Sequence, residues 1–281
     1  MKQKYDLHTH TTASDGSLSP SDLIKKAKEE AIELIAITDH DTVGGVREAL
    51  EAGKSLGVKV IPGVEISIGL ARGTMHLCGY MIDINSKAVK DNLAFLQKGR
   101  AGRNHEILKK LNESGMSITM EEIAKAAGAD VVGRPHFAKV LVDKGYVASR
   151  KEAFDELLAN GKPCYVDRIR LSKREALDMI KGSGGLAVLA HPGQLKLNSG
   201  DDYKAFFKEL RDLGVDGIEA YSSHHSDIEN QFFASTAKEL EMQVTGGSDF
   251  HGNNDPKVNL GVFGNDSNIS LINTEMFRWP R

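Results

Sequence analysis

Cysteine is nearly missing from this chain of 281 residues, which contains only Cys78 and Cys164. The two lie far apart in the sequence and form no Cys-x-x-Cys pair, so a disulfide framework is not expected. We expect both thiols to stay reduced and to fill space in the interior.

Long apolar runs are missing as well. The N-terminus, Met-Lys-Gln-Lys-Tyr-Asp, lacks the apolar core of a signal peptide, and no later stretch approaches the roughly 20 apolar residues of a membrane span. We therefore expect a soluble cytoplasmic protein that does not bind membranes. No feature of the sequence indicates an obligate protein partner.

An excess of charge of one sign is the third absence. The chain has 36 Lys and Arg against 39 Asp and Glu, and its net charge is −3. No overall field therefore draws it toward nucleic acid or a membrane. A polyanionic substrate would have to be held by a local group of basic residues.

Short apolar runs alternate with helical patterns over much of the chain, which is typical of β-α units around a parallel sheet. The expected strands are Tyr5–His10, Leu34–Thr38, Val58–Ser67, His76–Ile82, Gly185–Ala190, Gly217–Tyr221 and Val244–Gly247. Residues 86–160 instead have the pattern of several consecutive helices. The sequence thus predicts an α/β barrel of residues 1–85 and 161–281 with a helical cap inserted at 86–160.

Side chains that bind metals stand at the ends of these strands, or at the start in one case. They are His8, His10, His40, Glu65, His76, His191, Asp249 and His251. Strand ends converge at one mouth of a barrel, where barrel enzymes have their active sites. Nitrogen and oxygen ligands gathered there suit two or three divalent cations that act on water. Manganese is the favoured cation, and such a site also accepts iron or zinc.

The spacing of these residues supports a shared site. Side chains alternate along a strand, so His8 and His10 point to one face, and Asp249 and His251 can do the same. A single His-x-His is more often a polar strand end, and it is the number of such positions that favours metal binding. Glu65 would point into the mouth and bridge two cations, the alternative being a surface glutamate paired with a lysine.

Spacing alone leaves other candidates open. Asp15 lies in a Ser-Asp-Gly-Ser sequence, which could form a turn or supply a ligand. Arg134 at the start of a cap helix could bind phosphate together with free backbone N–H groups, or lie on the helix surface. Arg168 and Arg170 are weaker candidates of the same kind.

Taken in order, the motifs resemble those of the polymerase and histidinol phosphatase (PHP) superfamily. They are Asp6–His10, Thr38–Asp41, Pro62–Glu65, Ala190–Gly193 and Gly247–Gly252. Within the cap, Val132–Ala138 is similar to the branch that includes nucleoside 3′,5′-bisphosphate phosphatases and RNase AM (TrpH-like) proteins. The resemblance implies a distorted, TIM-like (β/α) barrel of seven strands with a helical cap and a trinuclear metal centre.

The resemblance also implies a role for each residue. Three sets would hold three cations: His8, His10, Glu65 and Asp249; Glu65, His76 and His191; and Asp15, His40 and His251. Substrate contacts would come from Ser14, Arg134, Arg168 and His225. Asp39 or Asp41 would hold His40 in its ligating tautomer.

One position departs from this branch. Gln194 and Leu195 stand where relatives often have a basic residue and an aromatic after His-Pro-Gly. Arg168 or Arg170 would then have to supply the missing phosphate contact.

These assignments predict metal-assisted hydrolysis of a small phosphoester. Water made acidic by the cations would attack phosphorus in line, without a covalent intermediate, while Arg134 helps to neutralise the growing charge. Glu65 and Asp249 would be essential to this step. Either His224 or His225 could face the pocket, and His225 is the first candidate for the general acid, with a bound water as the alternative.

Three functions are open at this point. The favoured one is removal of the 3′-phosphate from a nucleoside 3′,5′-bisphosphate to give a nucleoside 5′-monophosphate. The second is a phosphodiesterase or 5′-3′ exonuclease that acts on short RNA or cyclic sugar phosphates, and a nuclease would show a basic track beyond the pocket. The third is a non-catalytic, metal-binding regulatory module, against which the complete ligand set argues. In the first two cases the partner is a small phosphorylated substrate, a nucleotide or short RNA.

Overall fold

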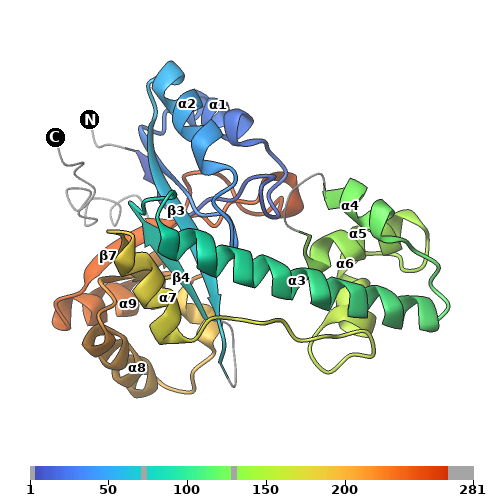
Figure 1. Cartoon of the computed structure of the whole chain (residues 1–281). Coiled ribbons are helices and arrows are strands. Elements are labelled where there is room, and N and C mark those ends of the chain that lie inside the picture. Colours follow the sequence, from blue (N-terminus) through green and yellow to red (C-terminus); the bar gives the residue numbers. More distant parts are fainter. Residues whose placement is uncertain (1–3, 71–74, 128–131, 265–281) are drawn as a thin grey trace.

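The computed structural model describes residues 4–70, 75–127 and 132–264, and within them seven strands form a sheet that curls into a nearly closed barrel (Figure 1). The strands neighbour one another in chain order: β1 (Tyr5–Asp6), β2 (Leu34–Ile37), β3 (Lys59–Ile68), β4 (Met75–Tyr80), β5 (Leu186–Leu189), β6 (Gly217–Ser222) and β7 (Gln243–Gly247). The ring closes where Leu7 N–H donates to the Gly246 carbonyl at 3.3 Å and Thr9 pairs with Phe250 in parallel. The predicted α/β barrel of seven strands is confirmed.

β4 is the strand that breaks the parallel pattern. It runs antiparallel to both β3 and β5, whereas the other neighbouring strands pair in parallel. The beginning of β4 therefore lies at the same edge of the barrel as the ends of the parallel strands. For this reason His76, near the start of a strand, joins side chains that follow the other strands.

Helices cover the outside of the barrel. They are α1 (Pro20–Glu29), α2 (Val46–Leu56), α7 (Lys173–Gly182), α8 (Gly200–Leu213) and α9 (Asp227–Glu239). The short 3₁₀ turns η2 (Pro192–Leu195) and η3 (Gly252–Asn254) follow β5 and β7 instead. Local sequence sets their starts: Ser19 caps α1 ahead of a proline, and capping boxes begin α7 and α9. Among the residues that the structure describes, no helix has both the length and the apolar character needed to cross a membrane.

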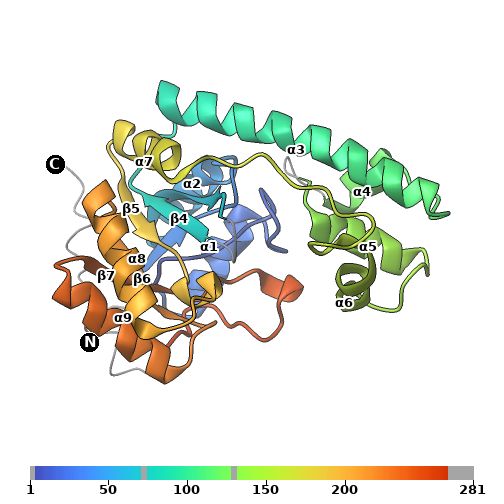
Figure 2. The same cartoon turned by 90° about the horizontal axis from the view of Figure 1, so that it is seen from below.

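The helix α3 (Lys87–Glu113) connects the barrel to a group of smaller helices, as both Figure 1 and Figure 2 show. These are α4 (Met120–Ala127), α5 (Arg134–Asp143), α6 (Arg150–Ala153) and the π-helical turn η1 (Phe154–Leu158). Val89, Leu93 and Leu96 of α3 pack in the barrel core, whereas Ile107 and Leu111 belong to a separate apolar cluster of the cap.

The cap cluster extends along the chain to Cys164, and Cys78 lies in the barrel core. Both thiols are buried and free. The division of the chain at residues 86 and 160 stays a prediction.

Candidate metal centre

The nine predicted ligands lie together at one mouth of the barrel. They are His8, His10, Asp15, His40, Glu65, His76, His191, Asp249 and His251, and they fall into overlapping groups that could each hold a cation. The backbone at this mouth is unusual, because His191 has φ of 26° and Asp249 has φ of 57°. Left-handed conformations of this kind are costly for residues other than glycine, and they cluster at functional sites.

Glu65 on β3 lies in the middle of the cluster, and its two oxygens face different imidazoles. Oε1 lies 2.7 Å from Nδ1 of His76 and 2.9 Å from Nε2 of His191. Oε2 lies 2.8 Å from Nδ1 of His40 and 3.3 Å from Nε2 of His10. A carboxylate placed between two sets of imidazoles has the arrangement of a bridge between cations.

The first group consists of His8, His10, Glu65 and Asp249. Oδ1 of Asp249 lies 3.0 Å from Nε2 of His10 and 3.4 Å from Nε2 of His8. Oε2 of Glu65 lies 3.3 and 3.4 Å from the same two nitrogens. Donor atoms that bind one cation at about 2.1 Å lie about 3–4 Å apart. These four side chains therefore have the spacing of ligands to one divalent cation.

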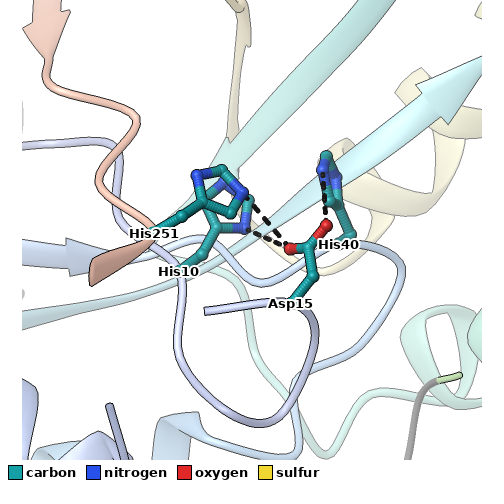
Figure 3. Close-up of side chains that lie close together, drawn as sticks. All are labelled: His10, Asp15, His40 and His251. Carbon is teal, nitrogen blue, oxygen red and sulfur yellow. Dashed lines mark ion pairs between the residues drawn. The ribbon is translucent and has the colours of Figure 1, made fainter. Parts of the chain in front are cut away.

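A further group consists of His10, Asp15, His40 and His251 (Figure 3). Oδ1 of Asp15 lies 3.2 Å from Nε2 of His251 and 3.8 Å from Nδ1 of His10, and Oδ2 lies 4.0 Å from Nε2 of His40. The rings of His10 and His251 stack with their centroids 4.1 Å apart. The Asp15 carboxylate thus points into the cluster of imidazoles, as a ligand would.

His76 and His191 complete the cluster on the other side of Glu65. Nδ1 of His76 lies 3.3 Å from Nε2 of His191. His40 also comes close enough to group with Glu65 and His76. His40 therefore stands between two of the predicted ligand sets.

The cluster is not satisfied by its own hydrogen bonds. Among the described residues, buried atoms without a hydrogen-bond partner include Nε2 of His10, Nδ1 of His40, Oε2 of Glu65 and Oδ1 of Asp249. Burial opposes charge here, yet Asp249 and Glu65 raise the pKa of His10 to about 9, and the imidazoles hold the pKa of Glu65 well below its usual range. Unpaired buried polar atoms are costly, and cations would satisfy them. The residues fit divalent cations, and such mixed ligands accept manganese, iron or zinc.

Asp39 fixes the loop that carries Asp15. Its carboxylate accepts hydrogen bonds from the N–H and the hydroxyl of Thr11, both at 2.7 Å, and from the hydroxyl of Ser14 at 2.6 Å. The prediction that Asp39 would hold His40 is therefore wrong, because other donors occupy this carboxylate. Ser14 was predicted to contact substrate, but it is only 2% exposed, and its hydroxyl donates to Asp39.

Arginines of α3 and of the segment before α7 meet beside the metal centre. Arg100 forms an ion pair with Asp41, and Arg168 lies 3.4 Å from the same carboxylate. Asp41 therefore does not hold His40 either. Arg103, one turn after Arg100, is buried and donates to the amide oxygen of its neighbour at 2.8 Å. Burial and the nearby guanidinium groups lower the pKa of Arg103 to about 9.

Arg100 and Arg103, which are buried, and Arg168, which is half-buried, are called the arginine group below. Only Asp41 pairs with them among the described residues, so positive charge is in excess. Arg100 and Arg103 were not predicted from the sequence. The two arginines lie three residues apart, on one face of a helix, and this spacing was the sequence signal that could have indicated a basic site.

Arg134 lies at the start of α5, as predicted. Its guanidinium donates to the Leu158 carbonyl at 3.0 Å and lies over the rings of Tyr165 and Phe154, at 5.3 and 5.9 Å from their centroids. Burial, together with nearby arginines that include Arg100, lowers its pKa. Arg134 therefore lies at the edge of the arginine group. Contacts within the cap already occupy part of its guanidinium.

Of the two histidines that follow β6, His224 is the one beside the metal centre. Its Nε2 lies 3.0 Å from Oδ2 of Asp249, and its side chain is 30% exposed. His225 instead donates from Nδ1 to the Ala220 carbonyl at 3.2 Å and accepts the Gly193 N–H at Nε2, at 3.1 Å. The backbone thus occupies both ring nitrogens of His225, and the structure does not bring this predicted residue into the cluster.

Glu219 is a functional candidate that the sequence analysis missed. It is fully buried on β6, and its Oε2 lies 2.6 Å from Nδ1 of His8. The thiol of Cys78 lies 3.8 Å from the same nitrogen. A charged residue inside an apolar strand was the signal that could have found it. An acceptor at Nδ1 leaves Nε2 of His8 free to face a cation.

The chain is similar to known proteins over most of its length. Residues 6–219 match the PHP domain family. The chain is 37% identical over 249 residues to the 5′-3′ exoribonuclease Rnm of Salmonella typhimurium, an alignment that covers 88% of this chain and 85% of that protein. It is 34% identical over 247 residues to a 3′,5′-nucleoside bisphosphate phosphatase of Chromobacterium violaceum, covering 88% and 86%.

Two further proteins extend the comparison. The chain is 32% identical over 251 residues to a phosphoribosyl 1,2-cyclic phosphate 1,2-diphosphodiesterase of Eggerthella lenta, covering 88% of this chain and 94% of that protein. A solved structure of an amidohydrolase from Chromobacterium violaceum, with bound sulfate and no metal, superposes with a TM-score of 0.84 at 32% identity, covering 93% and 91% of the two chains.

Proposed function

This chain belongs to the PHP domain family, and we propose that it is a metal-dependent phosphoesterase that removes the 3′-phosphate of nucleoside 3′,5′-bisphosphates. The products are a nucleoside 5′-monophosphate and phosphate. A relative that carries the name of this activity, 34% identical over 88% of the chain, supports the assignment.

The arginine group is the observation that carries the choice of substrate. His40 of the metal centre is followed directly by Asp41, which pairs with Arg100 and Arg168. A cluster of buried and half-buried guanidinium groups, suited to an anion, therefore adjoins the metal ligands. A substrate with two phosphates would use both places, with the 3′-phosphate at the metals and the 5′-phosphate at the arginines.

Bound divalent cations, for which we favour manganese over iron or zinc, would acidify a water and neutralise charge on the phosphoryl oxygens. The protein holds the ligands in place for this chemistry. Glu65 and Asp249 keep imidazoles from separate strand ends facing one another, and Asp39 fixes the loop of Asp15. Arg134 and the arginine group hold the substrate and exclude water from its far phosphate.

The contacts of His224 support it, in place of His225, as the residue that protonates the leaving 3′-oxygen. It is partly exposed at the mouth, and hydrogen bonding to Asp249 raises its pKa, which favours the protonated form that a general acid needs. His225 has no ring nitrogen left for this task, since the backbone uses both. The expected signature of His224→Gln is a fall in kcat and the loss of the alkaline limb of its pH profile.

The proposed function is tested by phosphate release from the manganese-loaded protein. The substrates are a nucleoside 3′,5′-bisphosphate and the matching 3′- and 5′-monophosphates. We expect kcat/KM for the bisphosphate to exceed that for the 3′-monophosphate by roughly ten- to a hundredfold, since charged hydrogen bonds to the 5′-phosphate contribute about 1.5–3 kcal/mol. Equal values for the two would remove the arginine group from the substrate site.

The same screen separates the alternatives. A relative named as a cyclic phosphate diphosphodiesterase makes cyclic sugar phosphates the proper comparison substrates. A metal-loaded protein that hydrolyses none of these esters would instead be a non-catalytic metal-binding module.

A further inference from the structure

A pocket lies along the flank of α3 that faces the start of α4. It has a volume of about 200 Å³; α3, from Gln97 to His105, forms one wall, and Met120 and Val132 form the other. We propose that this pocket, called the α3 pocket, binds the nucleobase of the substrate, so that nucleotides are hydrolysed much better than sugar phosphates without a base. This inference rests on the proposed function.

The α3 pocket adjoins the arginine group. Arg100 belongs to both, since its guanidinium pairs with Asp41 and the residue also lines the pocket. A second connection runs through Asn104, whose Oδ1 accepts a hydrogen bond from Arg103 at 2.8 Å and whose Nδ2 donates to the Val132 carbonyl at 3.0 Å. A ligand held by the arginine group can therefore extend directly into the pocket.

The covalent structure of a nucleotide calls for a base site in this place. The base and the 5′-phosphate are attached to the same ribose, so the base must lie close to the group that holds the phosphate. The proposed function puts the 5′-phosphate at the arginines and the 3′-phosphate at the metals, which leaves the base as the part of the substrate without a place. Figures 1 and 2 both show α4 beside the cap half of α3, so a base in the α3 pocket would lie between these two helices.

The walls of the α3 pocket suit a flat, uncharged ring. Ala101, Met120 and Val132 are apolar, and the thioether of a methionine makes favourable contacts with aromatic rings. His105 adds an imidazole, and bases stack on rings of this type. None of the described residues that line the pocket is Asp or Glu. The pocket therefore offers apolar contacts and stacking, without a negative charge that would select a cation.

The size of the α3 pocket suits one part of a larger ligand. At about 200 Å³ it is smaller than the roughly 300–1,000 Å³ of pockets that enclose a whole small ligand. With both phosphates of a nucleoside bisphosphate held elsewhere, the base is the part that remains to be enclosed. A sugar phosphate without a base has no group to place in the pocket, and it would leave these apolar walls in contact with water.

The polar groups of the α3 pocket do not select one base. Both polar atoms of the Asn104 amide are already hydrogen-bonded, and Nδ1 of His105 donates to the Ala101 carbonyl at 2.9 Å. Gln97 is exposed, and its amide can either donate or accept. Stacking accepts a base whatever its hydrogen-bonding edge. We therefore expect all four bases to bind, with the larger purines favoured over the pyrimidines by a few fold.

The test compares three substrates of the manganese-loaded protein: adenosine 3′,5′-bisphosphate, uridine 3′,5′-bisphosphate and 1-deoxyribose 3,5-bisphosphate, which has no base. We expect kcat/KM for the base-free compound to be lower than that for the adenosine compound by about tenfold or more, because the contacts of a buried ring are lost. The uridine compound should lie between the two. The difference should appear mainly in KM, since the base is remote from the reacting phosphorus.

Two variants change opposite walls of the α3 pocket. Ala101→Leu narrows it, and Met120→Ala removes an apolar wall. Each should lower the ratio of kcat/KM values, adenosine compound over base-free compound, by about threefold or more, while the base-free compound itself is hydrolysed as in the wild type. Gly102→Leu is the matched control, because it adds the same side chain at the next position of α3, where the space is open. It should leave the ratio unchanged, and thermal unfolding checks that all three variants are folded.

The outcomes separate this inference from the proposed function. Wild-type protein that hydrolyses the adenosine and base-free compounds equally well overturns the α3 pocket alone. A preference for the adenosine compound that Ala101→Leu and Met120→Ala both leave within twofold of the wild-type value also overturns it, because the base then binds elsewhere, and so does an equal fall of the ratio in Gly102→Leu. Wild-type protein that hydrolyses none of the three compounds overturns both proposals.

Discussion

Glu219 accepts a hydrogen bond from Nδ1 of His8 at 2.6 Å, and both side chains are fully buried in the barrel. The contact places the proton of His8 on Nδ1 and leaves Nε2 facing Glu65 and Asp249. Partners of this kind orient metal-binding histidines and increase their basicity.

Glu219→Gln should therefore weaken cation binding about 10–100-fold. Glutamine keeps the shape of the side chain but removes the negative charge beside the imidazole. The measurement is the metal content of dialysed protein together with a direct metal titration. Thr236→Val, which also changes a buried polar group but lies on α9, should leave the affinity unchanged. A Glu219→Gln protein with wild-type affinity would show that Glu219 only fills space.

Glu65→Gln should abolish turnover of the nucleoside bisphosphate. The carboxylate faces imidazoles on both sides, and an amide cannot bridge two cations or balance their charge. Asp249→Asn should have the same effect through the first group of ligands. Circular dichroism and thermal unfolding check that both variants stay folded. Near-wild-type activity with metal bound in either variant would contradict the assignment of the metal centre.

The strand ends explain how far the sequence could predict the site. Apolar runs in the sequence, such as those of β2 and β3, show where strands lie. The metal-binding residues near the ends of these runs could therefore be predicted to meet at one mouth of the barrel. His76 joined that set although it begins a strand, and the reason appeared only in the structure, because β4 is antiparallel to its neighbours.

Contacts between distant segments could not be predicted in the same way. Arg100 meets Asp41 because α3 crosses from the barrel to the cap, and no local pattern relates residues 59 positions apart. The choice between His224 and His225 depends on the turn after β6, where one ring reaches Asp249 and the other is held by backbone groups. Glu219, by contrast, had a local signal, since it is charged within an apolar strand.

Metal binding should tighten as the pH rises from 6 to 9. In the metal-free protein, burial opposes protonation of His10, but Asp249 and Glu65 raise its pKa to about 9, above the ordinary value of 6.5. A cation binds only the unprotonated imidazole, so below this pKa each binding event displaces a proton. The apparent affinity should then rise about tenfold per pH unit for each displaced proton.

Calorimetry tests this linkage. At pH 7 the observed binding enthalpy should depend on the ionisation enthalpy of the buffer, with a slope that gives the number of protons released. In Asp249→Asn the pKa of His10 should fall, and fewer protons should be released. A wild-type enthalpy that is the same in every buffer would contradict the prediction.

Arg103→Met should stabilise the protein in chloride buffer and remove its response to sulfate. Arg103 is buried beside Arg100 and Arg168, and its own hydrogen bonds are to a neutral amide. Replacing a buried charge that lacks an ionic partner with an apolar side chain is often stabilising, by about 1–4 kcal/mol. Sulfate, as a stand-in for substrate phosphate, should stabilise the wild type by about 2.7 kcal/mol at one hundred times its Kd, because it binds the folded state alone.

A matched control identifies the buried charge as the cause. Burial and the nearby guanidinium groups lower the pKa of Arg103, but a guanidinium stays protonated in proteins, so the wild type carries this buried charge throughout the experiment. Arg174→Met, whose side chain is exposed on α7, should keep the wild-type stability in chloride and the wild-type response to sulfate. If Arg103→Met instead lowers the melting temperature equally with and without sulfate, Arg103 is a packing residue and the 5′-phosphate must be held by Arg100 and Arg168 without it.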